Sequence, residues 1–208
     1  MKYIRVTVGD YCENCYLLYN DNNEAVIIDP GADAERIIKY IDRYSLRPVA
    51  ILLTHGHFDH IGAVQECRDR YGIPVYASGD EVQLLRDPAL NSSADLGGYP
   101  ISLIADYTFG DGEILPISGF SIHTLLTPGH TVGSACFYVP DMGAVFSGDT
   151  LFRHTVGRYD LPTGDGAALV RSLREKLFLL PPDTRVIPGH GLETVIGQEM
   201  ELGTDDFL

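Results

Sequence analysis

A short apolar run that ends in a cluster of histidines limits the possible folds of this chain more than any other feature. Residues 49–53 read Val-Ala-Ile-Leu-Leu, and residues 54–60 follow as Thr-His-Gly-His-Phe-Asp-His. A continuous apolar run of this length is typical of a strand buried on both faces, so we expect layers packed on both sides of its sheet. The histidines then stand at the strand end, where a rigid scaffold presents loops to a shared site.

Three later segments repeat this arrangement of an apolar run followed by a turn with a histidine or an aspartate. They are Pro-Gly-His at 128–130, Gly-Asp-Thr at 148–150 and Pro-Gly-His-Gly at 188–191. Neutral imidazole and carboxylate are the usual ligands of zinc, iron and similar ions. Together the segments supply seven candidate ligands, which suits two ions that share one carboxylate: His55, His57, Asp59, His60, His130, Asp149 and His190.

The remaining pattern predicts strands and helices that alternate in two halves of the chain. Alternating or apolar runs predict strands at 3–8, 15–19, 25–28, 49–53, 113–117, 121–126, 135–139, 144–146 and 185–187. Helical spacing of apolar residues predicts helices at 34–44, 63–70 and 167–178. Residues 86–107 lack periodicity, so we expect an irregular surface segment, and whether it covers a substrate cleft stays open. Strand-rich halves closed by helices imply sheets with helices outside them, in one domain over residues 1–208.

Composition excludes several classes of protein. A chain with 45% hydrophobic and 21% charged residues is expected to bury a real core. Its net charge of −14, with scattered basic residues, argues against a nucleic-acid partner. The first residues contain no apolar stretch of a signal peptide, and no run of apolar residues is long enough to span a membrane. With four cysteines and none of these signals, we expect a cytoplasmic protein with reduced thiols.

The chain resembles the metallo-β-lactamase-fold superfamily and, within it, the glyoxalase II-like (hydroxyacylglutathione hydrolase-like) hydrolases. The segments that carry the resemblance are 29–31, 54–60, 129–130, 147–150 and 189–191. The resemblance implies an αββα sandwich of two mixed β-sheets flanked by helices, with the site along one edge of both sheets. It also implies that His55, His57 and His130 hold one metal, that Asp59, His60 and His190 hold the other, and that Asp149 lies between them.

Such a centre predicts a metal-dependent hydrolase that uses a hydroxide bridging two ions. A small-molecule thioester is the expected substrate, because a thiolate leaves without strong acid help, and an ester or lactone comes next. We assign Asp59 a supporting catalytic role in orienting the hydroxide. Two divalent ions are expected, with zinc first and iron or manganese as alternatives, since all three accept mixed His and Asp ligands. The oligomeric state stays open.

A mononuclear-iron persulfide dioxygenase is the alternative function, because such members of the superfamily use the equivalents of His55, His130 and Asp149. Antibiotic hydrolysis is disfavoured, because class B β-lactamases generally carry cysteine at the position of Asp149. Glyoxalase II enzymes also have a C-terminal helical region that contacts glutathione. Here only the acidic stretch 192–208 follows the last candidate ligand, so we expect no such domain.

Two further residues have specific expectations. Arg158 stands in the stretch after Asp149 that resembles the family, so we expect it to bind a substrate carboxylate unless it pairs with Asp160 or Asp165. Asp29 is a candidate to hydrogen-bond a ligand histidine from outside the centre. The Cys12–Cys15 pair has metal-ligand spacing, but without a second pair we interpret both cysteines as structural.

Overall fold

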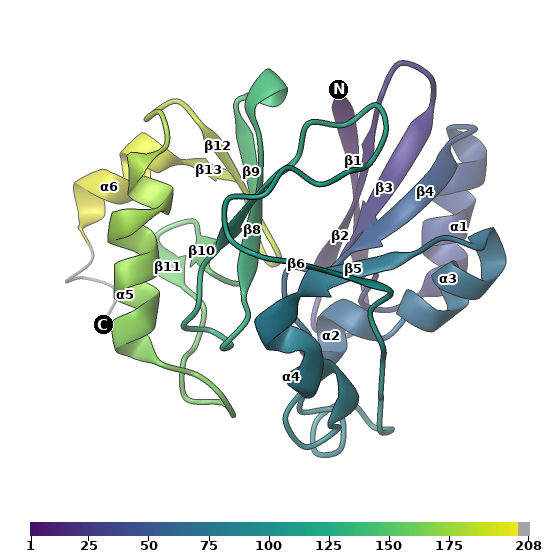
Figure 1. Cartoon of the computed structure of the whole chain (residues 1–208), viewed down its shortest axis with the longest axis horizontal. Helices are drawn as coiled ribbons and strands as arrows, with labels where there is room; N and C mark the ends of the chain where they lie inside the picture. Colours follow the sequence, from purple (N-terminus) through teal and green to yellow (C-terminus); the bar gives the residue numbers. More distant parts are fainter. Residues whose placement is uncertain (204–208) are drawn as a thin grey trace.

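Two β-sheets face each other in the computed structural model, and helices cover their outer faces (Figure 1). The structure describes residues 1–203, so the last five positions of the predicted domain, 204–208, lie outside it. The layer order is helices, sheet, sheet, helices, which confirms the predicted αββα sandwich.

The first sheet has six strands in the order of the chain: β1 (Lys2–Val8), β2 (Glu13–Tyr19), β3 (Glu24–Ile28), β4 (Arg47–Leu52), β5 (Val75–Ser78) and β6 (Tyr107–Phe109). Strands β1 to β3 are antiparallel, and β3 to β6 are parallel. The connections carry four helices: α1 (Ala34–Arg43), α2 (Phe58–Ile61), α3 (Val64–Tyr71) and α4 (Val82–Arg86). A parallel pair needs such crossover segments, which explains the α-helices after β3 and β4.

The second sheet has five strands in the order β13-β12-β9-β8-β7. Their bounds are β7 (His123–Leu126), β8 (Ala135–Val139), β9 (Ala144–Gly148), β12 (Arg185–Pro188) and β13 (Thr194–Val195). Only β9 and β12 pair in parallel, across the helix α5 (Gly166–Glu175). The short hairpin β10 (Leu151–Phe152) and β11 (Thr155–Val156) precedes α5, and α6 (Ile196–Leu202) ends the described chain. Both sheets are therefore mixed, as predicted.

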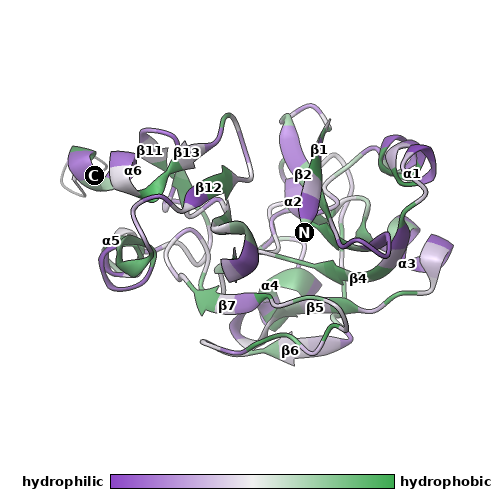
Figure 2. Cartoon of the chain, turned by 90° about the horizontal axis from the view of Figure 1, so that it is seen from above, coloured by the Kyte–Doolittle hydropathy of each residue, from purple (hydrophilic) through white to green (hydrophobic). Residues whose placement is uncertain are grey.

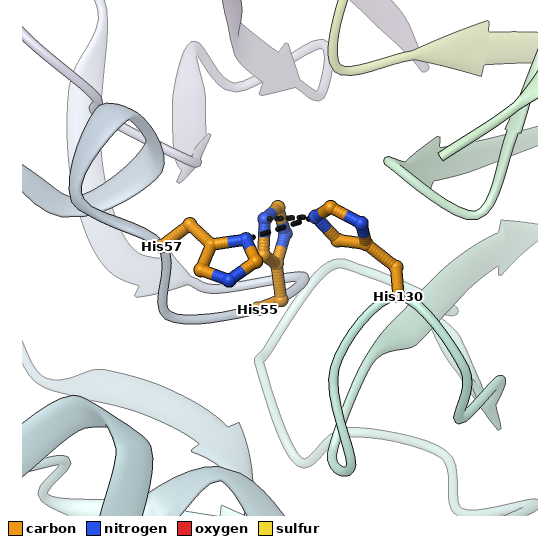
Figure 3. Close-up of side chains that lie close together, drawn as sticks. All are labelled: His55, His57 and His130. Atoms are coloured by element: carbon orange, nitrogen blue, oxygen red, sulfur yellow. Dashed lines mark hydrogen bonds between the residues drawn. The ribbon is translucent and has the colours of Figure 1, made fainter. Parts of the chain in front are cut away.

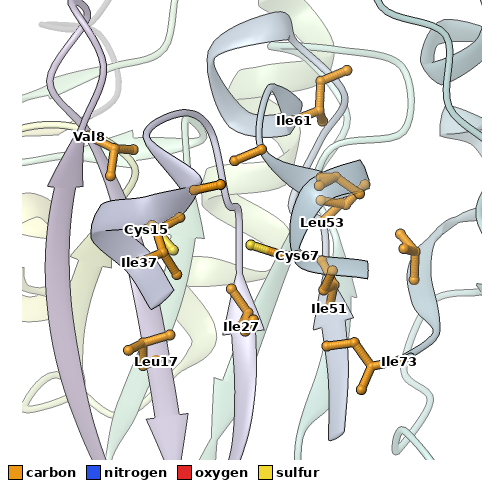
Figure 4. Close-up of a cluster of buried hydrophobic side chains, with 14 of the residues drawn as sticks. Val8, Cys15, Leu17, Ile27, Ile37, Ile51, Leu53, Ile61, Cys67 and Ile73 are labelled. Carbon is orange, nitrogen blue, oxygen red and sulfur yellow. The ribbon is translucent and has the colours of Figure 1, made fainter. Parts of the chain in front are cut away.

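Alternating side chains build the layers of the core. In β2, Cys15 and Leu17 pack with α1 and α3, whereas Tyr16 and Leu18 face the second sheet. Figure 4 shows the outer cluster, in which Ile37 of α1 and Cys67 of α3 cover the strands. On the other side of the molecule, Val145 of β9 packs with α5 and α6. In Figure 2, α1 and α5 each carry hydrophobic and hydrophilic residues, as expected for helices with one face against a sheet.

The long periodic elements lie within a few residues of their predicted positions. The segment predicted to be irregular, 86–107, is so from Asp87 to Asp106, between α4 and β6. One predicted strand is wrong: residues 113–117 form only an isolated bridge between Ile114 and His123. Pro116 has no N–H, and the N–H of Ile117 turns back to the carbonyl of Leu115, so no ladder extends. The predicted helix at 167–178 ends at Glu175 and continues as a 3-10 turn (Leu177–Leu179).

Within residues 1–203, every helix is too short or too polar to cross a bilayer.

Candidate metal centre

The candidate ligands gather where strands of both sheets end at one edge. Parallel strands bring their carboxyl ends together, so the segments after β4, β9 and β12 share this edge with the 127–134 loop after β7. Backbone hydrogen bonds join the sheets here. The Ala135 N–H donates to the Thr54 carbonyl over 2.8 Å, and the Asn14 N–H donates to the Gly189 carbonyl over 2.7 Å. The seven candidate side chains are thereby brought together from the two halves of the chain.

Three histidines form the first cluster, which Figure 3 shows. His130 Nε2 lies 2.9 Å from His57 Nδ1 and 3.2 Å from His55 Nε2. All three side chains are buried. His55 and His57 come from the loop after β4 in the first sheet, whereas His130 comes from the loop after β7 in the second. The cluster therefore exists only when the two sheets are docked.

The second cluster consists of Asp59, His60 and His190. His190 Nε2 lies 3.3 Å from Asp59 Oδ2 and 3.3 Å from His60 Nε2. Asp59 and His60 stand on the single-turn helix α2, directly after the first two histidines of the motif. The helical turn therefore places Asp59 and His60 in the second cluster, whereas His55 and His57 of the same motif belong to the first.

Asp149 lies between the clusters. Its Oδ2 is 3.7 Å from His130 Nε2 in the first cluster and 3.7 Å from His190 Nε2 in the second. Its Oδ1 is 3.3 Å from His60 Nε2 yet has no hydrogen-bond partner among the described residues. The position is the one that a carboxylate shared by two ions requires.

Outer hydrogen bonds fix the orientation of four of the five histidine rings. The Nδ1 atoms of His130 and His190 lie 2.6 Å from the Arg158 carbonyl and 3.1 Å from the Tyr11 carbonyl, which assigns each Nδ1 as a donor. His60 Nδ1 lies 3.0 Å from Asp29 Oδ2, and His55 Nδ1 lies 3.1 Å from the Thr54 hydroxyl. A ring that donates from Nδ1 keeps a lone pair on Nε2, which here points inward.

Burial favours the neutral, ligating form in the first cluster. It lowers the pKa of His57 to about 3 and also lowers the pKa values of His55 and His130. Burial by itself opposes ionisation of Asp149, but the facing His60 outweighs it and lowers the pKa of this carboxyl. In the second cluster, burial is outweighed by the facing Asp149 and Asp59, which raise the pKa values of His60 and His190. The first cluster is therefore the one whose imidazoles are held in the neutral form that binds a metal ion.

The arrangement fits divalent metal ions. Each cluster brings three ligand atoms within 4.8 Å of one another. His55 Nε2 and His130 Nε2 face each other over 3.2 Å, although both rings donate from Nδ1 and have no proton to share between them. His57 Nε2 and Asp149 Oδ1 are buried and without a hydrogen-bond partner among residues 1–203. A shared cation resolves the contact between His55 and His130, because it accepts every lone pair that faces inward.

A cavity of about 280 Å³ opens over the two clusters. Its lining combines the candidate ligands with apolar side chains, namely Tyr11, Phe58, Leu96, Phe152 and Leu161. Ser92 and Leu96 belong to the irregular segment 86–107, so this segment does border the cleft. Arg158 also lines the cavity, but its guanidinium donates two hydrogen bonds to Asp160, at 2.7 and 2.9 Å.

Sequence reasoning missed three buried polar residues around the centre. Asn14 donates to the Pro188 and Gly191 carbonyls on either side of His190, both over 3.2 Å. Glu13 lies 3.9 Å from His60, and both of its oxygens lack a hydrogen-bond partner within the described chain. Glu81 contacts loops of both sheets. No local pattern separates these residues from surface polar residues, because their partners are distant in sequence.

Sequence comparison places the chain among metal-dependent enzymes. A family model described as the metallo-beta-lactamase superfamily matches residues 9–190. The probable metallo-hydrolase YqgX of Bacillus subtilis is 45% identical over 203 residues, which cover 97% of this chain and 95% of that protein. The hydroxyacylglutathione hydrolase GloC of Haemophilus influenzae is 39% identical over 197 residues, covering 93% of this chain and 92% of that protein.

Solved structures lead to the same family assignment as the sequence comparison. The BLEG-1 B3 metallo-beta-lactamase superposes with a TM-score of 0.92 at 46% identity, covering 96% of this chain and 97% of that one. TTHA1623 in a di-iron-bound form superposes with a TM-score of 0.84 at 40% identity, covering 95% and 96% of the two chains. From the family match, the relatives and the shared fold, we conclude that this chain belongs to the metallo-beta-lactamase superfamily.

Proposed function

We propose that this protein is a binuclear metallohydrolase that cleaves a small thioester. The observation that carries the proposal is the position of Asp149 between two three-residue clusters on the floor of a cavity. His55, His57 and His130 would hold one ion, and Asp59, His60 and His190 would hold the other. Two such ions would supply a nucleophile from water at neutral pH and polarise a substrate carbonyl.

The chain's own residues then hold and orient the reactants. Asp59 carries a carboxylate beside His190 at the cavity, where it can accept a proton or a hydrogen bond from attacking water. The apolar wall around Phe58 and Phe152 suits an acyl group and excludes competing water. A thiolate suits a site of this kind, because the thiol has a pKa near 8.5 and leaves without a dedicated general acid.

Arg158 is the candidate for a substrate carboxylate, but binding there requires exchange with Asp160. The pair is exposed, so its attraction is weak and such an exchange costs little. An anionic substrate group would take the place of the Asp160 carboxylate on the guanidinium. Removing Arg158 is therefore expected to raise the KM for anionic substrates and to leave the KM for neutral substrates unchanged.

The relatives support thioester hydrolysis as the reaction, and they are compatible with either zinc or iron as the metal. GloC is named for the hydrolysis of a glutathione thioester, which supports the thioester. We propose zinc, because its mixed His and Asp ligation is common in hydrolytic sites, with iron as the alternative that the di-iron form of TTHA1623 favours.

A metal count combined with a thioester panel tests the proposal. We expect two metal equivalents and oxygen-independent thiol release from acyl thioesters. Asp149→Ala and His57→Ala should each lose metal and activity. His123→Ala is the matched control, because His123 stands in β7 and is neither a candidate ligand nor part of the cavity lining. Turnover retained in Asp149→Ala would refute the proposed centre.

A persulfide dioxygenase is the second candidate. Its favouring observation is that His130 lies 3.2 Å from His55 and 3.7 Å from Asp149, the three side chains that would hold one iron. One iron equivalent with oxygen consumption on glutathione persulfide would establish it and exclude the hydrolase. A β-lactam belongs in the same panel, since one similar structure is named a B3 metallo-beta-lactamase.

A further inference from the structure

Glu81 is a buried carboxylate that no step of the proposed reaction uses. It ends the 3-10 turn Gly79–Glu81, directly before α4, and only 1% of its surface is exposed. Its two oxygens bind different parts of the chain. Oε1 accepts the N–H of Gly56 over 2.9 Å, and Oε2 accepts the N–H of Gly133 over 2.8 Å.

The two amides that Glu81 binds belong to the two loops that build the first cluster. Gly56 stands between His55 and His57 in the loop after β4. Gly133 follows His130 in the loop between β7 and β8 of the other sheet. One carboxylate therefore connects the loops whose histidines must meet.

Both loops also pack closely against the segment that begins with Glu81. A Cβ atom added at Gly133 would lie 2.4 Å from the backbone nitrogen of Glu81. A Cβ atom added at Gly56 would lie 2.7 Å from the Leu84 side chain on α4, one turn further on. Gly133 thus approaches the backbone of Glu81 more closely than a residue with a Cβ allows, whereas Gly56 packs against the ends of leucine side chains. In both loops the N–H of the glycine donates to the carboxylate.

We propose that Glu81 is a positioning residue that sets the distance between the His55–His57 pair and His130, and so determines the affinity of the first cluster for its metal. This inference rests on the proposed metal centre. Charge-assisted hydrogen bonds to backbone N–H groups are stronger than neutral ones, and both are shielded here from water. The second cluster has no direct contact with Glu81 and should be far less affected.

Two substitutions separate this role from simple filling of space. In Glu81→Gln, the amide keeps one acceptor but turns an NH₂ group toward the N–H of the other glycine, so one loop must move. In Glu81→Asp, the charge remains, but the shorter side chain loses reach to at least one loop. Outer partners of metal ligands typically contribute 10–100-fold in metal affinity, which is the loss expected for one of the two ions.

The test is chelator competition on the metal-loaded full chain, with zinc as the probe and a cobalt-substituted sample to follow ligand geometry. In both variants we expect one zinc to weaken by about 10–100-fold, with a shifted cobalt absorption band, while the other zinc is retained. Glu199→Gln is the matched control, because Glu199 is an equally buried carboxylate that bonds His154 and Thr194, outside both clusters.

The outcomes separate the possible failures. Wild-type affinity for both zinc ions in Glu81→Asp would overturn the inference, as would an equal loss of zinc in Glu199→Gln. If Glu81→Gln does not fold, Glu81→Asp decides alone, because aspartate keeps the negative charge and is smaller than glutamate, so it fits the same buried space. Failure of the proposed function is seen separately, since the wild-type protein would then bind fewer than two ions before any substitution is made.

Discussion

Replacing Asp29 by asparagine tests whether an outer hydrogen-bond network holds the centre together. Asp29 follows β3, and its backbone has a φ of +49°, which asparagine tolerates better than most residues. Its carboxylate accepts three hydrogen bonds. Oδ1 accepts the Thr54 N–H over 2.7 Å, while Oδ2 accepts the Thr54 hydroxyl over 2.5 Å and faces His60 Nδ1 at 3.0 Å.

The magnitude follows from these three bonds. An asparagine oxygen in the place of Oδ2 preserves two of them and turns the amide NH₂ toward the buried N–H of Thr54. One buried donor is then unsatisfied, which costs about 1–3 kcal/mol, so we expect a loss of about 2 kcal/mol in the free energy of unfolding. The weaker acceptor for His60 also lowers metal affinity, by about 10-fold at the lower end of such effects.

Urea denaturation of the metal-loaded and chelated protein measures the free energy of unfolding, and chelator competition measures the metal affinity. Asp33→Asn is the matched control, because Asp33 also has a left-handed backbone, with a φ of +50°, but within residues 1–203 its side chain accepts only from the exposed Gly9 N–H. A change below about 0.5 kcal/mol in Asp29→Asn, or an equal change in the control, would refute the reasoning.

Three further predictions concern the rest of the molecule. Burial lowers the pKa of His57 to about 3, so below pH 6.5 the unfolded chain gains a proton at this residue that the folded chelated chain does not. From pH 7 to 5 this residue alone should therefore remove about 2 kcal/mol of stability, measured in urea titrations as the pH-dependent difference between the wild type and His57→Asn. Gly129→Ala should cost about 3 kcal/mol in the same assay, because its φ is +144° and a Cβ would lie 2.4 Å from the Leu169 Cα; an unchanged midpoint contradicts this. A thiol reagent should label one cysteine rapidly in the native protein and four after denaturation, because Cys12 is exposed while burial raises the thiol pKa values of the other three, Cys15, Cys67 and Cys136. Rapid labelling of two or more native thiols would refute the described packing.

Long elements with clear periodicity were predictable from the sequence because local pattern and tertiary position agree in them. Helix α1 buries Ile37 and Ile41 at the predicted spacing. Short elements were not predictable in this way. The single turn of α2 and the four residues of β5 contain too few residues for a period to show, and contacts with distant segments decide their conformation.

The same distinction applies to the site. The seven candidate ligands were found because each follows an apolar run at a turn, which is a local signal. The resemblance to a known family added their division into two sets, and the structure brings the side chains into those sets. Glu81 and Asn14 gave no such signal. Glu81 occupies the end of a short turn, and only the approach of two distant glycines distinguishes it from a surface glutamate.

The path of the chain between the sheets has a consequence for how variants should be screened. The chain leaves the first sheet after Phe109 and enters the second at His123, and every strand of the second sheet comes after that crossing. Each proposed metal site takes ligands from both sides of the crossing. A substitution that shifts one sheet against the other by a fraction of an ångström can therefore leave the melting temperature of the metal-free protein almost unchanged while metal affinity falls. For this architecture, metal retention is a more sensitive measure of sheet docking than thermal stability.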